Sequence, residues 1–267
     1  MSTRIAVSQR AAARRVPPLG GFNLTFLAIE VRRLLRNRRT TIFTLILPVV
    51  FYLLFRNGRR GGQPVDGTSL NAYVMVSMGV YGAMIASTAG GAMVAVERAL
   101  GWSRQLRLTP LRPFAYMAIK VLSAMVLSLM SVTAVFAVGA LTGVRMPAMD
   151  WILCGVLAWA GSLVFATFGL FMGYLFPSEN VMQIIGPVLA LSAFFGGIFI
   201  PLNKMGPASS TFQAIAPFTP TYGVGEIARS PLIGSGPTVR SVVNIMLWTA
   251  AFVIGAATLF RRDTQRV

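Results

Sequence analysis

Residues 97–113, ERALGWSRQLRLTPLRP, separate two long apolar blocks of the sequence. Four of these 17 residues are arginine and one is glutamate, and Pro110 and Pro113 close the segment, so it does not cross a bilayer. The blocks on either side, at about 72–96 and 115–143, are long enough for helices that cross roughly 30 Å of hydrocarbon. The stretch therefore predicts two membrane-spanning helices joined by a short basic connection.

The composition of the whole chain agrees with this prediction. Of its 267 residues, 55% are hydrophobic and 12% are charged, and the mean hydropathy is +0.69. Because charged residues make up about a quarter of an ordinary soluble domain, we expect an all-α integral membrane protein. Apart from Lys120 and Arg240 near the starts of two spans, the charged residues lie outside the apolar blocks, which is typical of cytosolic flanks and does not indicate that the net charge of +17 serves nucleic-acid binding.

We expect a single domain with six transmembrane helices over residues 22–262. The expected spans are about 40–55, 72–96, 115–143, 151–176, 181–200 and 239–260. Residues 1–21 predict a disordered cytosolic tail, with an organelle transit peptide as the alternative, and residues 263–267 a short cytosolic tail. With both termini in the cytosol, 16 lysines and arginines lie inside and 7 outside, which favours this orientation.

Two further segments are neither ordinary spans nor ordinary loops. Residues 22–38 predict an amphipathic helix in the cytosolic interface, with a helix packed on a soluble partner as the alternative. Its expected apolar face is Leu24, Leu27, Ala28, Val31, Leu34 and Leu35, and its expected polar face is Glu30, Arg33, Arg36 and Asn37. Residues 201–238 are too long for a turn and too apolar for a solvated loop. They predict short re-entrant helices in the outer leaflet or, equally well, a small folded outer cap.

The inventory of reactive side chains excludes several kinds of site. The sequence has no histidine, Cys154 is its only cysteine, and neither Lys120 nor Lys204 follows a glycine. A histidine-based triad, a zinc site of cysteine and histidine, and a phosphate-binding loop of the GxxxxGK[ST] kind are therefore excluded. We expect no catalytic residue, no metal and no cofactor in this chain.

The acidic residues fall at the ends of expected spans or in loops: Glu30, Asp66, Glu97, Asp150, Glu179, Glu226 and Asp263. The sequence thus offers no proton relay at membrane depth, which an ion-coupled carrier would need. If the protein moves a substrate, we expect the energy to come from a separate ATPase on the cytosolic face. In residues 97–113, Ala99, Trp102 and Leu106 share one helical face, which fits either a groove on a soluble partner or anionic lipid.

Several motifs, taken in order, resemble the membrane subunit of an ABC transporter of the type-2 export class. The matching stretches are RRLLRNRRT (32–40) before IFTLILPVVFYLLF, then Glu97-Arg-x-x-Gly101 leading through LRLTPLRP (106–113), and APFTPTYGVGEIAR (216–229) before the last span. The likeness covers about residues 22–262 and is greatest for the multidrug and antibiotic-resistance permeases of the class. The sequence differs from the larger members of the class, which carry a fused ATPase and a large outer domain.

This resemblance implies roles for several residues. Residues 22–38 become the family's elbow helix with Arg32, Arg33 and Arg36, and 98–108 its coupling helix, seated on a nucleotide-binding ATPase subunit that binds ATP and Mg. The implied ATPase contacts are Glu97, Arg98, Gly101, Trp102, Arg104, Leu106 and Arg107. A second permease subunit, identical or paralogous, would complete a path lined by Tyr81, Met84, Ser87, Phe194, Phe195 and Phe199. Ordinary packing within the spans is the competing explanation for those six residues.

The substrate expected from an apolar, aromatic path is a hydrophobic or amphipathic compound such as a drug, a lipid or a metabolite. The excess of arginine over lysine, 22 to 2 in the sequence, favours a bacterial inner membrane over an organelle. Two other functions stay open: an ion-coupled secondary carrier, and a membrane scaffold that recruits a cytosolic protein without transport.

Overall fold

The computed structural model describes residues 21–57, 69–101, 112–202 and 206–265, and all structural statements below concern these ranges. The long helices are α1 (Leu24–Arg36), α2 (Arg38–Asn57), α3 (Leu70–Ala99), α5 (Pro113–Leu141), α6 (Ala148–Leu175), α7 (Ser178–Phe195) and α10 (Val239–Gln265). Between α7 and α10 lie two short helices, α8 (Ser209–Ile215) and α9 (Pro220–Ile233), and a 3-10 turn precedes each of them. Every regular element in the described ranges is helical, which confirms the expected all-α class.

Five of these helices are long and apolar enough to cross a membrane: α3, α5, α6, α7 and α10. Helices α1 and α2 meet at a bend of 68°, and the pair would supply a sixth span if the two count together. The molecule therefore has five to six candidate spans, against the six expected. The expected fifth span ended near residue 200, but α7 ends at Phe195, because Gly197 adopts a left-handed φ of 70° that terminates the helix.

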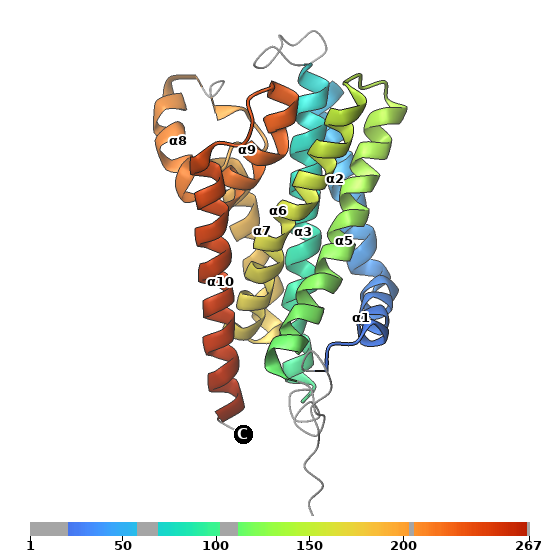
Figure 1. The fold of residues 1–267 in the computed structure, drawn as a ribbon, viewed down its shortest axis with the longest axis vertical. Coiled ribbons are helices and arrows are strands. Elements are labelled where there is room, and N and C mark those ends of the chain that lie inside the picture. The colour runs from blue at the N-terminus through green and yellow to red at the C-terminus, as the bar shows by residue number, and fades with distance from the viewer. Residues whose placement is uncertain (1–20, 58–68, 102–111, 203–205, 266–267) are drawn as a thin grey trace, which may run out of the picture.

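Helix α3 is the centre of the bundle. In its most apolar window 83% of the residues are buried, compared with 17% for α10. Figure 1 shows α5, α6 and α7 around it. The small residues of α3 allow this position: a Cβ atom added at Gly91 would lie 2.5 Å from the carbonyl oxygen of Ala166 on α6. The contact between α3 and α6 is thus made backbone to backbone.

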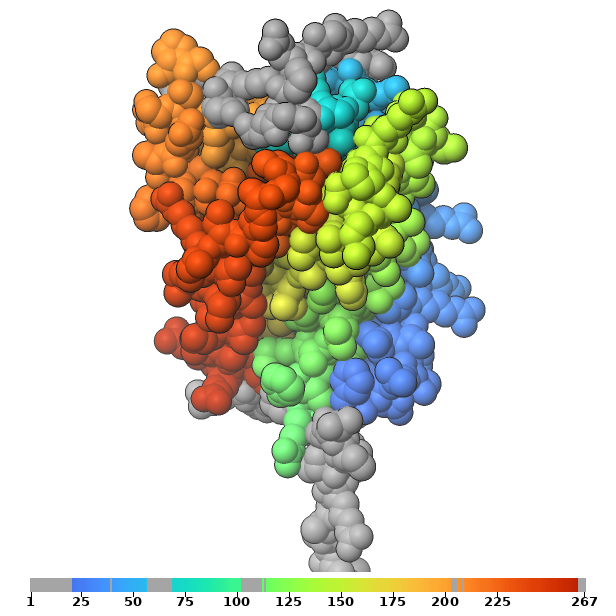
Figure 2. Space-filling model, turned by 45° about the horizontal axis from the view of Figure 1, so that its top comes forward, coloured from blue at the N-terminus to red at the C-terminus, as the bar shows by residue number. Residues whose placement is uncertain are grey.

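The bundle has two distinct ends (Figure 1). Helix α1 and the last turns of α10 lie at one of them, called the α1 end here, and α8 lies at the other, the α8 end. In the space-filling view the α8 region stands at one corner of its end (Figure 2). Helix α9 buries one face in the bundle, whereas α8 buries none of its residues. The two arrangements expected for residues 201–238, re-entrant helices or an outer cap, both stay predictions.

Candidate functional site

An apolar groove runs between α2, α3 and α7. It encloses about 500 Å³, and its lining includes Phe43 and Leu47 of α2, Tyr81 and Ile85 of α3, and Leu189 of α7. Few polar side chains face it, among them Thr40 and Thr44 near the start of α2. A groove of this size and polarity suits an apolar portion of a small molecule, or an apolar helix of another subunit.

The six residues expected to line a substrate path lie in different parts of the structure. Tyr81 lines the groove, and its ring centroid lies 4.8 Å from that of Phe199 and 5.8 Å from that of Phe51 on α2. Phe194 and Phe195 instead pack with Phe212 of α8, with centroids 5.5 and 5.7 Å from the Phe212 ring.

The two remaining candidates lie inside the bundle. Met84 and Ser87 are fully buried, and the Ser87 hydroxyl donates to the carbonyl of Ala83 one turn earlier at 2.6 Å. Of the six candidates, the structure thus places Tyr81 in the groove lining, with Phe199 in contact with its ring. A role in transport stays a prediction for all six.

A buried cluster of charges joins α1, α3 and α5 at the α1 end. The Lys120 ammonium donates to Glu30 at 2.6 Å and also to Glu97, and the Arg33 guanidinium donates to Glu30 at 2.8 Å and also to Glu97. The hydroxyl of Tyr116 donates to the second oxygen of Glu97 at 2.5 Å. Two carboxylates and two cations balance, which offsets the large penalty for removing each charge from water.

This cluster changes the orientation expected for α1. Glu30 is expected on the polar face, opposite the apolar side chains, but it is 4% exposed and points into the bundle, on the same side as the buried Leu34. The expected placement of Glu30 was wrong, because its partner is a lysine 90 residues away that helical periodicity within α1 does not reveal. Of the elbow arginines, Arg33 joins the cluster, and Arg32 and Arg36 are exposed.

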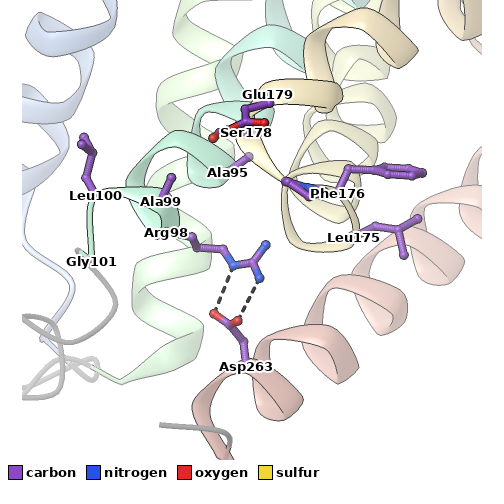
Figure 3. Close-up of a pocket in the computed structure, with 11 residues that line it drawn as sticks. Ala95, Arg98, Ala99, Leu100, Gly101, Leu175, Phe176, Ser178, Glu179 and Asp263 are labelled. Atoms are coloured by element: carbon purple, nitrogen blue, oxygen red, sulfur yellow. Dashed lines mark hydrogen bonds and ion pairs between the residues drawn. The ribbon is translucent and has the colours of Figure 1, made fainter.

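A second set of interactions holds the end of α3 to α6 and α10. Arg98 donates to the carbonyl oxygens of Gly173 and Tyr174 at 3.1 and 3.0 Å, and pairs with Asp263 at 2.8 Å (Figure 3). It therefore caps the C-terminus of α6 and ties it to the end of α10. Its guanidinium is engaged within the chain, although we had expected it to contact a partner.

A polar cavity of about 740 Å³ surrounds this ion pair and opens at the α1 end. Its lining comes from the end of α3, the turn between α6 and α7, and the end of α10, and it includes Gly101 and Glu179 (Figure 3). The other expected partner contacts, Trp102, Arg104, Leu106 and Arg107, lie outside the described residues. Within the ranges that the structure covers, no group of three or more Cys, Asp or Glu side chains is arranged to hold a metal ion.

Comparison with known proteins gives two findings. A family described as "ABC-2 type transporter" matches residues 23–227 of the chain. The chain is also 28% identical, over 237 residues, to a protein of Bacillus subtilis (strain 168) described as "Putative transport permease YvfS". That alignment covers 88% of this chain and 95% of the relative, so the two correspond over nearly their full lengths.

Proposed function

The chain belongs to the ABC-2 type transporter family, which makes it a transmembrane subunit of an ABC transporter, and from this premise we propose that it serves an ATP-driven exporter of hydrophobic or amphipathic compounds. The match of the family over residues 23–227 is the observation that carries the proposal. ATP and Mg would be bound by a separate nucleotide-binding subunit. Two permease subunits, identical or paralogous, would form the complete membrane part.

The groove between α2, α3 and α7 supports the substrate class. Its lining is largely aliphatic and aromatic, and Tyr81 offers a hydroxyl that can orient a bound molecule. Fixed charges are missing from the groove lining that the structure describes, so an amphiphile or a drug fits it better than a multiply charged sugar. In a pair of subunits the two grooves would face a common path.

The α1 end supports the proposed coupling to an ATPase. The last turn of α3, which leads into the segment between α3 and α5, carries Glu97 and Arg98, and the two polar networks hold these residues to α1, α5, α6 and α10. Movement of this segment by a partner would therefore reach several spans at once. We propose that ATP-driven closure of two nucleotide-binding subunits pushes the paired segments together and converts the path from inward-open to outward-open.

The proposed orientation follows the excess of basic residues, with both termini in the cytosol of a bacterium and the protein in its inner membrane. Under this orientation Arg32 and Arg36, which are exposed on α1, would contact lipid phosphates of the inner leaflet.

Transport in inverted membrane vesicles tests the proposal, with the dye Hoechst 33342 as the probe. We expect uptake that needs ATP and persists after collapse of the ion gradients. The described acidic residues lie at the ends of the spans or in α1 and α9, so they do not form an ion pathway through the membrane. Gly186→Trp should abolish uptake, since a Cβ atom there meets no atom within 4 Å and an indole would enter the groove. Gly186→Ala is the matched control and should retain uptake.

The rival functions predict different results. An ion-coupled carrier would transport the dye with an ion gradient and no ATP. A scaffold would give no transport in either condition, and ATP-driven uptake by wild type that Gly186→Trp removes would exclude both.

A further inference from the structure

A polar pocket at the α8 end is not used by the proposed export path. It encloses about 310 Å³ between α3, α9 and α10. The side chains that give it its character are Tyr73, Gln213, Tyr222, Glu226, Arg229 and Arg240. Two of these six are cations and one is an acid, so the pocket is positively charged overall.

Arg229 on α9 is the most unusual residue of this pocket. It is 4% exposed, its Nη1 donates to the Ser77 hydroxyl at 3.1 Å, and its guanidinium lies 4.9 Å from the centroid of the Tyr73 ring. Among the described residues no carboxylate lies within ion-pairing distance of it. A buried guanidinium normally has an anionic partner, because desolvation of an unpaired charge is costly.

Most donors of Arg229 are not taken by Ser77. A guanidinium has five N–H donors, and Ser77 accepts one hydrogen bond. Over the described part of the chain, the buried side-chain atoms without a partner are Asn244 Oδ1 and Thr249 Oγ1, so no nitrogen of Arg229 is both fully buried and without a partner. Because Arg229 also lines the pocket, its guanidinium can donate to an anion bound there.

The neighbouring groups also favour an anion. Arg240 adds a second cation, and Gln213 adds an amide donor. Burial, followed by the nearby Glu226 carboxylate, raises the pKa of Tyr222, so its hydroxyl remains protonated, and it shares a hydrogen bond with Glu226. In the described structure Glu226 forms no ion pair with either arginine, and the two arginines outnumber it in the pocket lining.

We propose that this pocket binds the phosphate or carboxylate head group of an amphiphile, with Arg229 as the principal contact and Arg240 at the rim. The apolar surface beside the rim suits the remainder of such a molecule, since Val239 and Val243 next to Arg240 on α10 are 80% and 45% exposed. The site lies at the end opposite the segment that would meet an ATPase, and it does not depend on the proposed export function.

Calorimetric titration of the purified full chain in a non-ionic detergent tests this site. The probe is dihexanoyl phosphatidic acid, with dihexanoylglycerol as its neutral counterpart and inorganic phosphate as the free anion. We expect phosphatidic acid to bind, Arg229→Gln to weaken the affinity about tenfold through loss of a charge-assisted contact, and Arg240→Gln to weaken it by a smaller factor. Glu226→Gln should strengthen binding, because it removes the one acid among the described residues of the pocket lining. Arg145→Gln, an exposed arginine outside the pocket, is the matched control and should leave the affinity unchanged.

The outcomes separate the source of the anion from the existence of the site. Binding of phosphatidic acid with no competition by phosphate supports an amphiphile head group, and equal binding of inorganic phosphate supports the anion site with a free ion as its occupant. Equal binding of the neutral counterpart would overturn the proposal. So would an unchanged affinity in folded Arg229→Gln, and if that variant fails to fold, unchanged affinities in both Arg240→Gln and Glu226→Gln would overturn it.

Discussion

A single lysine, Lys120, contacts both buried carboxylates at the α1 end of the molecule. Its side chain is 2% exposed, and those of its partners Glu30 and Glu97 are 5% and 4% exposed. An ammonium in this position is stable because it is paired, and the carboxylates are stable for the same reason. The three side chains come from α5, α1 and α3, so one group of ionic contacts fixes α1 to the bundle.

Replacement of Lys120 by methionine should strongly destabilise the protein. The variant leaves two buried carboxylates with Arg33 as their one described cation, and breaking a buried pair in this way costs about 3–5 kcal/mol. Thermal unfolding of the purified chain in detergent measures the loss. Arg32→Gln is the matched control, because Arg32 is exposed on α1 and forms none of the described ion pairs. Equal midpoints for the two variants would contradict a structural role of the cluster.

Arg98 and Asp263 should differ in their effect although they form one ion pair. Both side chains are about a quarter to a third exposed, so the pair itself contributes less than about 1 kcal/mol, and Asp263→Asn should have a small effect on stability. Arg98→Gln should cost more, because the α6 carbonyls of Gly173 and Tyr174 also lose their donor. Denaturation of both variants under one condition gives the comparison, and a larger loss for Asp263→Asn would contradict the capping role.

At the level of elements, the contact between α3 and α6 depends on glycine. A Cβ atom at Gly169 would overlap the carbonyl oxygen of Thr88 on α3, and one at Gly173 would lie 3.2 Å from the carbonyl oxygen of Ala92. Both glycines therefore lie on the side of α6 that meets α3.

Gly169→Ala should therefore lower the stability by about 1–3 kcal/mol, because two backbones must separate to admit one methyl group. Gly186→Ala on α7 is the control, since nothing lies within 4 Å of its added Cβ atom and alanine favours a helix by up to about 1 kcal/mol. Thermal unfolding should rank Gly186→Ala at or above wild type and Gly169→Ala below it. The reverse order would mean that α3 and α6 can move apart freely.

The spans could be predicted from the sequence because length and apolar character alone determine them. Four of the expected spans begin within three residues of the first residues of α3, α5, α6 and α7. The last expected span begins at residue 239, as α10 does. The inner face of α1 could not be predicted in this way, since lipid and protein interior accept the same apolar side chains. The pairing of Glu97 with Lys120 was easier to predict, because the two lie 23 residues apart, near the end of α3 and the start of α5, and so at the same end of two consecutive helices.

The candidate path was predicted less well than the spans. Tyr81 lines the groove and contacts Phe199, but Met84 and Ser87 lie on sides of α3 that neighbouring helices cover, and they are fully buried. Which side of a span faces a path depends on the neighbouring helices, and one sequence contains no direct record of them. The same limit applies to Arg229, whose burial depends on contacts with α3.

Taken as a whole, the molecule has its polar networks at its two ends and an apolar groove between them. The network at the α1 end surrounds the start of residues 97–113. This is the segment that we propose to contact the nucleotide-binding ATPase subunit. If an ATPase is seated there, the substitution of Trp102 and Leu106 by alanine should remove the apolar side of the contact without disturbing the spans. Insertion and thermal stability of the double variant should match those of wild type.

The most direct test of the proposed function is a pull-down of the tagged chain from its native membrane in mild detergent, with wild type beside the Trp102→Ala, Leu106→Ala double variant. We expect a soluble ATPase to co-purify with wild type and to be lost from the variant, while both chains are recovered in equal amount. Absence of any ATPase from the wild-type sample, or equal recovery of an ATPase with the double variant, would contradict the assignment of residues 97–113 as the seat of an energising partner.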